Sequence, residues 1–177
     1  MNRRNAIRNV VVISAGATLL PSCLRQDKSA LSLKNLSITS SQEKMLAELT
    51  ETIIPKTPAF IGAKDLRSHE FVLTMVDDCT SPEEHKKFTN GMQSFEEACK
   101  KKWDKDFEKC TPEQRTELIQ MIEKKQEIPE DAANFYGTVK RYTLQSFTTS
   151  KEYMVDIRKY KLVPGGNYKG CVPVKKA

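Results

Sequence analysis

The sequence predicts an all-α protein: a single small domain of about five helices with an irregular C-terminal tail. Apolar residues recur at three- and four-residue steps over most of the chain, which is the spacing of one helix face. Three segments carry helix-start signals, in which Ser or Thr precedes acidic or amide residues. Low glycine content and the lack of alternating β-branched runs argue against a sandwich or barrel.

The first helix is predicted to begin at a capping box, Ser40–Glu43, and to end at Ile54, because Pro55 disfavours helical geometry before it. Its inward face would carry Met45, Leu46, Leu49 and Ile53. A loop at 56–64 leads to a second helix from about Asp65 to Cys79. The inward face of that helix would carry Phe71, Val72, Met75, Val76 and Cys79.

A third helix starts at Ser81, where a cap, a proline and two acids favour the first turn. It should bury Phe88, Met92, Phe95 and Cys99. The lysine run 100–102 that follows is interpreted as a solvated helix end, with a docking patch as the alternative. Thr111 and Pro112 open a fourth helix that buries Leu118, Ile119 and Ile122.

Pro129 and the two acids after it open a fifth helix. Its inward residues would be Phe135, Tyr136, Val139, Thr143 and Phe147. Thr149 or Ser150 then caps a shorter segment to about Ile157. The tail 160–174 contains two prolines and a glycine pair, and is predicted to lie irregularly over the helices.

The first 22 residues resemble an export signal. An arginine pair, Arg3 and Arg4, precedes an apolar run from Val10 to Leu20, which is too short for a membrane span of about 20 residues. The pair favours the twin-arginine route, which carries folded proteins, although Ala6 replaces the usual phenylalanine; an ordinary Sec signal is the alternative.

Cys23 follows Leu20-Pro21-Ser22, a pattern similar to a bacterial lipobox, so the thiol of Cys23 is the predicted lipidation site. A free or disulfide-bonded Cys23 is the alternative. The predicted organisation is a signal peptide at 1–22, a lipidated tether at 23–39 and a helical domain at 40–177. The predicted location is the periplasm, on a membrane-anchored lipoprotein.

The charge of the chain does not indicate a nucleic-acid partner. The formal net charge is +6, but three arginines lie in the signal, and the mature chain keeps only +3. No basic stripe with interleaved aromatic residues remains after removal of the signal.

Four cysteines remain after Cys23 is assigned to lipid, an even number for an oxidising compartment. Cys99 and Cys110 flank the turn between two helices and are the favoured pair, which leaves Cys79 with Cys171. Buried free thiols are one alternative. A bond from Cys171 to a partner subunit is another.

Catalytic residues are not evident in the sequence. His69 and His85 are the only histidines, and each is interpreted as solvated or hydrogen-bonded rather than as a ligand. Asp77 and Asp78 form a solvated turn or, alternatively, a functional pair. The chain has no Cys-x-x-Cys-His haem motif and no glycine-rich phosphate loop. No catalytic residue, metal site or cofactor site is therefore assigned to this chain.

Several short segments are similar to one known family. They are the Arg-Arg signal and the segments 52–55, 62–65, 69–72, 77–83, 142–150 and 163–173. Together they resemble the gluconate 2-dehydrogenase subunit 3 family, the small subunit of periplasmic flavin-dependent sugar dehydrogenases, over about 40–174.

The resemblance implies an accessory subunit without an active site of its own. It implies a partner that is an FAD-dependent oxidoreductase of the glucose–methanol–choline type, which acts on CH–OH groups. The small subunit would bind, stabilise and help to export that partner, and a c-type cytochrome is a further candidate partner as electron acceptor. Two alternatives stay open: a lipoprotein module that binds a small ligand, and a stand-alone enzyme using Asp77, Asp78 and one histidine.

Overall fold

The computed structural model describes residues 29, 31–124, 126 and 128–161. This part of the chain is helical and contains no β-strand, which confirms the predicted all-α class. The α-helices are α2 (Ser40–Ile53), α3 (Ser68–Cys79), α4 (Pro82–Trp103), α5 (Pro112–Glu123) and α6 (Glu130–Thr149). A 3₁₀ turn, η1 (Phe107–Lys109), precedes α5, and a π-helical turn, η2 (Tyr153–Ile157), follows α6.

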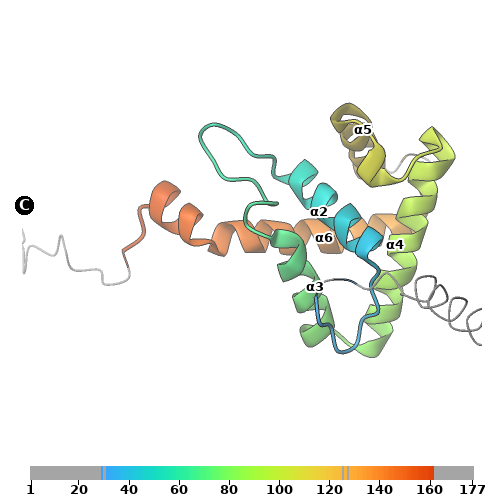
Figure 1. The fold of residues 1–177 in the computed structure, drawn as a ribbon, viewed down its shortest axis with the longest axis horizontal. Coiled ribbons are helices and arrows are strands. Elements are labelled where there is room, and N and C mark those ends of the chain that lie inside the picture. Colours follow the sequence, from blue (N-terminus) through green and yellow to red (C-terminus); the bar gives the residue numbers. More distant parts are fainter. Residues whose placement is uncertain (1–28, 30, 125, 127, 162–177) are drawn as a thin grey trace, which may run out of the picture.

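Helix α6 is the central element, because it packs against α4, α3, α2 and α5 (Figure 1). Aromatic rings fill its contact with α4: the ring centroids of Phe88 and Phe135 are 5.1 Å apart, and those of Phe95 and Phe135 are 5.5 Å apart. The helix backbones approach closely at Gly91, where a Cβ atom would lie 2.6 Å from the carbonyl oxygen of Asp131. Gly91 is therefore required by packing.

Most of the predicted inward faces are buried. The buried residues of these faces include Met45, Leu46, Leu49, Val72, Val76, Phe88, Met92, Phe95, Cys99, Leu118, Ile119, Ile122, Phe135, Tyr136, Val139 and Thr143. Cys79 is an exception, because its side chain is exposed at the last residue of α3. The prediction that Cys79 points inward is therefore wrong.

The helix starts at Ser81 and Thr111 are confirmed. Each residue forms a complete capping box, in which its side chain accepts the N–H of the third helical residue and that residue's side chain accepts the cap N–H. At α2 the box lies one residue earlier than predicted: Thr39 is the cap and Gln42 its partner. Helix α3 begins at Ser68 rather than Asp65, because residue 67 adopts a left-handed conformation with φ of 53°.

Residues 31–38 pack onto the domain, although they were predicted to be part of the tether. Leu36 and Ile38 are buried in the core, and the Asp77 carboxylate accepts hydrogen bonds from the backbone N–H groups of Lys34, Asn35 and Leu36 at 2.7–2.8 Å. The packed domain therefore begins before residue 40.

The end of α6 and η2 project on the left in Figure 1, away from α4 and α5. The side chain of Ser150 accepts the N–H of Tyr153 at 3.1 Å, as expected for the cap of a short segment. Phe147 is only partly buried, and its ring centroid lies 5.4 Å from that of Tyr153. The predicted tail beyond residue 161 lies outside the described residues.

Candidate functional site

The predicted export and lipidation residues, Arg3, Arg4 and Cys23, lie outside the described residues, as does Cys171. The structure therefore places only Cys79, Cys99 and Cys110 among the sequence-predicted site residues.

Cys99 and Cys110 lie together in the core. Their sulfur atoms are 3.4 Å apart, and both residues are buried between α4 and the turn before α5. Burial, with a further contribution from the Cys110 sulfur, raises the pKa of the Cys99 thiol to about 12, so Cys99 is protonated at neutral pH. The disulfide between them stays a prediction, and the exposed Cys79 remains available to a partner cysteine.

Asp77 has a structural role. Burial alone would raise the pKa of its carboxyl, but the three backbone N–H donors of residues 34–36 outweigh that effect, and the net shift of the pKa is downward. Asp78 is exposed and pairs with Lys34 at 3.1 Å. The interpretation of Asp77 as part of a solvated turn is therefore wrong.

The two histidines do not join these carboxylates in a shared hydrogen-bond network. The Nε2 atom of His85 lies 2.9 Å from the carbonyl oxygen of Val76, a local backbone contact, which fits the predicted hydrogen-bonded role. His69 is partly buried at the other end of α3, and burial lowers its pKa despite the nearby Glu70 carboxylate. The contacts of Asp77, Asp78 and His85 are thus those of residues that support the fold, whereas the Nδ1 atom of His69 is buried without a hydrogen-bond partner.

The lysine run at the end of α4 is mostly paired. Lys100 contacts the Asp106 carboxylate at 3.1 Å, and Lys102 contacts Glu117. Lys101 is exposed and lines a groove between α4 and α5. These pairings fit the predicted helix end, with Lys101 as the residue that points to solvent.

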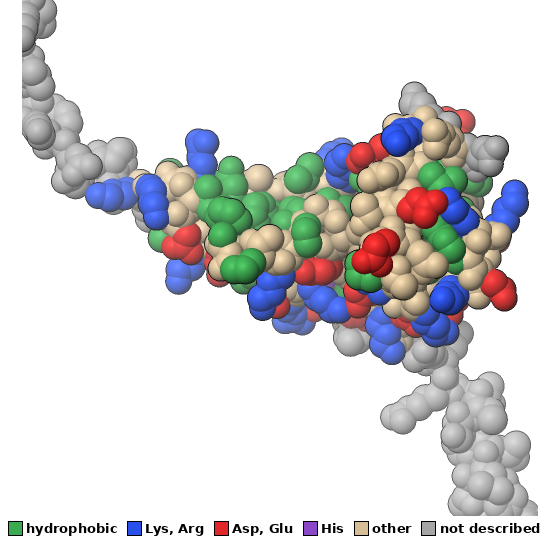
Figure 2. All heavy atoms as spheres, turned by 90° about the horizontal axis from the view of Figure 1, so that it is seen from above, with side chains coloured by type: hydrophobic (Ala, Val, Ile, Leu, Met, Phe, Trp, Pro, Cys, Tyr) green, Lys and Arg blue, Asp and Glu red, His purple; other side chains and the backbone are tan. Residues whose placement is uncertain are grey.

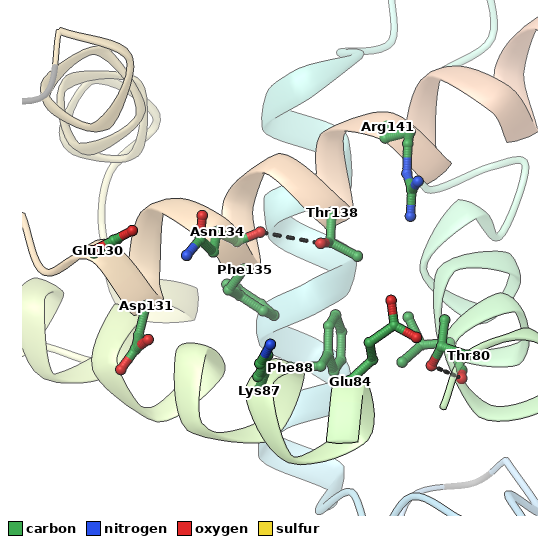
Figure 3. A pocket seen from close by; sticks show the side chains of 11 residues that line it. Thr80, Glu84, Lys87, Phe88, Glu130, Asp131, Asn134, Phe135, Thr138 and Arg141 are labelled. Atoms are coloured by element: carbon green, nitrogen blue, oxygen red, sulfur yellow. Dashed lines mark hydrogen bonds between the residues drawn. The ribbon is translucent and has the colours of Figure 1, made fainter. Parts of the chain in front are cut away.

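A groove of about 510 Å³ separates the first turns of α4 from α6 (Figure 3). It is lined by Val76, Thr80, Glu84, Lys87, Phe88, Glu130, Asp131, Asn134, Phe135, Thr138 and Arg141. Five of these side chains are charged, with both signs represented. The groove is therefore a mixed polar surface and not the large apolar pocket that would favour the small-ligand alternative.

Several polar groups of this groove already have local partners. The Glu84 carboxylate accepts the Ser81 N–H at 2.8 Å, and the hydroxyl groups of Thr80 and Thr138 donate to backbone carbonyls of their own segments. These hydrogen bonds lie at helix ends or, for Thr138, within α6, so we assign no reaction to the groove.

A second surface, which was not predicted from the sequence, gathers apolar side chains at one end of the molecule. We call it the apolar end and define it by the exposed residues Phe60, Leu144, Val155, Ile157 and Tyr160. Figure 2 shows hydrophobic side chains collected over the projecting end of the molecule. The sequence carries a weak signal for this surface, because Val155 and Ile157 are apolar residues after a helix cap that do not continue the inward face of any predicted helix.

Metal ligands do not cluster in the part of the chain that the structure describes: no group of three or more His, Cys, Asp or Glu side chains there could hold an ion. Within the same ranges, none of the helices has the length and apolar character of a membrane span.

Comparison with known proteins gives one family. The family model described as Gluconate 2-dehydrogenase subunit 3 matches residues 40–165, a range that includes every element from α2 to η2. The match confirms the family resemblance found in the sequence. No curated protein and no solved structure matches the chain.

Proposed function

The chain belongs to the gluconate 2-dehydrogenase subunit 3 family, and on that premise we propose that it is a non-catalytic small subunit that binds, stabilises and helps to export a flavin-dependent dehydrogenase. The partner is an oxidoreductase of the glucose–methanol–choline type that acts on CH–OH groups of a sugar or of gluconate. FAD belongs to that partner, and a c-type cytochrome accepts its electrons.

The observation that carries this proposal is the extent of the family match. Residues 40–165 include every helix of the described part of the chain, so the match concerns the helical bundle and not one motif. The assigned contacts of Asp77, Asp78 and His85 are to backbone groups or to an exposed lysine. These contacts are those of residues that maintain the fold, as expected for an accessory subunit.

The second part of the proposal concerns export. The arginine pair directs the folded complex through the twin-arginine route, and acylation of Cys23 holds the domain at the periplasmic side of a membrane. A twin-arginine signal on an accessory subunit has a clear use if a folded flavoprotein without its own signal travels with it.

Replacement of the arginine pair tests the carrier role. In the native host, Arg3→Lys with Arg4→Lys should leave both this protein and the flavin-dependent dehydrogenase activity in the cytoplasm. The control is Arg8→Lys, which alters a basic residue outside the pair and should not change export. Dehydrogenase activity is assayed in the separated periplasmic, membrane and cytoplasmic fractions. Normal delivery of the flavoprotein in the double variant would show that the carrier role is wrong.

A cysteine variant tests the anchor. Cys23→Ser should move the protein from the membrane fraction to the soluble periplasm, because stable attachment needs more than one acyl chain. Cys79→Ser, which changes an exposed cysteine of the folded domain, should stay with the membrane.

A further inference from the structure

The exposed apolar side chains of this protein are not scattered. Among the described residues, every large hydrophobic side chain that is exposed lies either in the loop between α2 and α3 or in the segment 144–160. Phe60 in the loop is 51 % exposed and Tyr160 is 52 % exposed. Concentration of apolar surface at one end is typical of a protein–protein contact.

The loop that carries Phe60 is held in place by hydrogen bonds. The Glu51 carboxylate of α2 accepts the N–H groups of Lys56 and Lys64, both at 2.8 Å. Gly62 makes this possible, because a Cβ atom there would lie 2.6 Å from both Glu51 oxygens. The loop therefore presents Phe60 in a defined position, which lowers the entropy lost when a partner binds.

The loop, the end of α6 and the turn η2 together form a hollow of about 170 Å³. Phe60, Ile61, Phe147, Tyr153 and Ile157 supply most of its apolar lining, and Ala59 completes it. A volume of this size holds about one aromatic ring. The hollow is thus suited to receive a single large apolar side chain.

Two carboxylates, Glu152 and Asp156, line the same hollow. Within the hollow, a cationic group next to a partner's apolar side chain would pair with these carboxylates, while the exposed Lys151, Arg158 and Lys159 of the same segment lie outside its lining. An apolar centre with aromatic residues and a polar rim is the usual composition of a protein interface.

We propose that the apolar end is the docking surface for the flavin-containing catalytic subunit, which places an apolar side chain flanked by Lys or Arg in the hollow. This inference rests on the proposed function, since it takes the existence of that partner from it. The apolar end lies within the matched residues 40–165, whereas most of the C-terminal tail does not.

The carboxylates argue against two other occupants. Insertion of this end into a bilayer would bury Glu152 and Asp156 against lipid, where carboxylates are costly. A two-fold contact between two copies, centred on the hollow, would bring each carboxylate close to its own counterpart. A separate protein can bring a single cationic group to the carboxylates of the hollow without placing them against lipid or against their own counterparts.

The test compares charged substitutions at the apolar end with one elsewhere. The tagged full-length chain replaces the native copy in its own host and is purified from detergent-solubilised membranes, and FAD per chain and dye-linked sugar or gluconate oxidation are measured. Ile157→Glu, Phe60→Glu and Asp156→Lys should each reduce bound FAD about tenfold or more. The control Gln120→Glu, at an exposed site on α5, should retain FAD within about twofold. Unchanged circular dichroism and melting temperature show that the variants are folded.

The results separate this inference from the proposed function. If the wild-type chain carries no FAD, the proposed function and the docking surface are both wrong. If the wild-type chain carries FAD and the three variants keep it, only the docking surface is wrong.

Three further results would assign the apolar end to another occupant and overturn the proposal. In the first, the mature Cys23→Ser chain without its partner sediments with phosphatidylethanolamine–phosphatidylglycerol vesicles, and the additional substitution Ile157→Glu abolishes this vesicle binding. In the second, that chain is a dimer that Ile157→Glu dissociates. In the third, a chain that ends at Lys161 binds much more flavoprotein than the full chain, which would make its own tail the occupant.

Discussion

Replacement of Asp77 by alanine should detach residues 31–38 from the domain. The Asp77 carboxylate accepts three backbone N–H groups, and hydrogen bonds to a charged group contribute about 1.5–3 kcal/mol each. If the three donors, of which only that of Leu36 is fully buried, all stayed without partners, the cost would be at most about 5–9 kcal/mol. The chain avoids that cost by releasing the segment, so that the donors bind water.

The released state sets the expected magnitude. Exposure of Leu36 and Ile38 costs about 1.5–3 kcal/mol for each side chain, and the regained backbone entropy offsets part of it. We therefore expect Asp77→Ala to lower the free energy of unfolding by about 2–4 kcal/mol. Asp78→Ala is the matched control, because it removes an exposed ion pair with Lys34 and should cost below about 0.5 kcal/mol.

The pH dependence of stability follows from the same contacts. The folded-state pKa of Asp77 lies below its unfolded value, so its contribution is complete above the unfolded pKa of about 4 and is lost as the pH falls through the folded value. The difference in stability between wild type and Asp77→Asn should therefore shrink below about pH 4. For a group whose pKa is raised on folding, the contribution to stability would instead be lost as the pH rises.

Urea unfolding followed by circular dichroism measures these differences, and hydrogen exchange reports the amides of residues 34–36. Asp77→Ala should remove exchange protection there while α4 and α6 stay protected. Equal stabilities of Asp77→Ala and Asp78→Ala, with protection retained at 34–36, would refute the reasoning.

Three further measurements test the core. Under oxidising conditions Cys99 and Cys110 should form a disulfide, which lowers the mass of the chain by two hydrogen atoms. The disulfide should raise the free energy of unfolding by about 3 kcal/mol, and dithiothreitol should remove that gain. An unchanged mass after oxidant treatment of the unfolded and refolded chain would contradict the predicted disulfide. In urea unfolding, Gly91→Ala should destabilise the protein by about 1–3 kcal/mol. Gly137→Ala, whose added Cβ meets no atom within 4 Å, should stabilise the protein by about 0.5–1 kcal/mol. Similar effects at both sites would be inconsistent with the close helix contact at Gly91. Arg115→Lys should cost about 1–3 kcal/mol in the same assay, because lysine cannot reproduce the bonds to two backbone carbonyls; a neutral result would mean that these bonds add nothing.

Helix starts could be predicted where the local signal was unambiguous. Ser81 and Thr111 are each followed by proline, which fixes the first helical position. At α2, three consecutive hydroxyl residues, 39–41, offer the same capping chemistry, so the sequence does not determine which one is used. In the structure, Thr39 takes the extended conformation that a cap requires.

Long-range partners explain the main errors. The donors to Asp77 lie 41–43 residues before it in the chain, and no local pattern connects them. Residues 31–38 showed no helical face, because Leu36 and Ile38 belong to a non-helical segment. The apolar end could not be predicted for a related reason: among the described residues, the exposure of Phe60 depends on how the helices pack together and not on a local pattern.

The packing of residues 31–38 also limits the reach of the proposed lipid anchor. If Cys23 carries the lipid, seven residues separate it from Leu31, and the eight steps along the chain, at about 3.5 Å each, span at most about 28 Å. The domain is then held close to the membrane surface. Insertion of ten Gly and Ser residues after Lys28 should leave FAD binding unchanged and raise exposure of the domain to protease added to intact spheroplasts. Because Asp77 sets the end of this short connection, Asp77→Ala should lengthen it by the released segment and raise protease exposure similarly. No change in either variant would show that the connection does not set the distance.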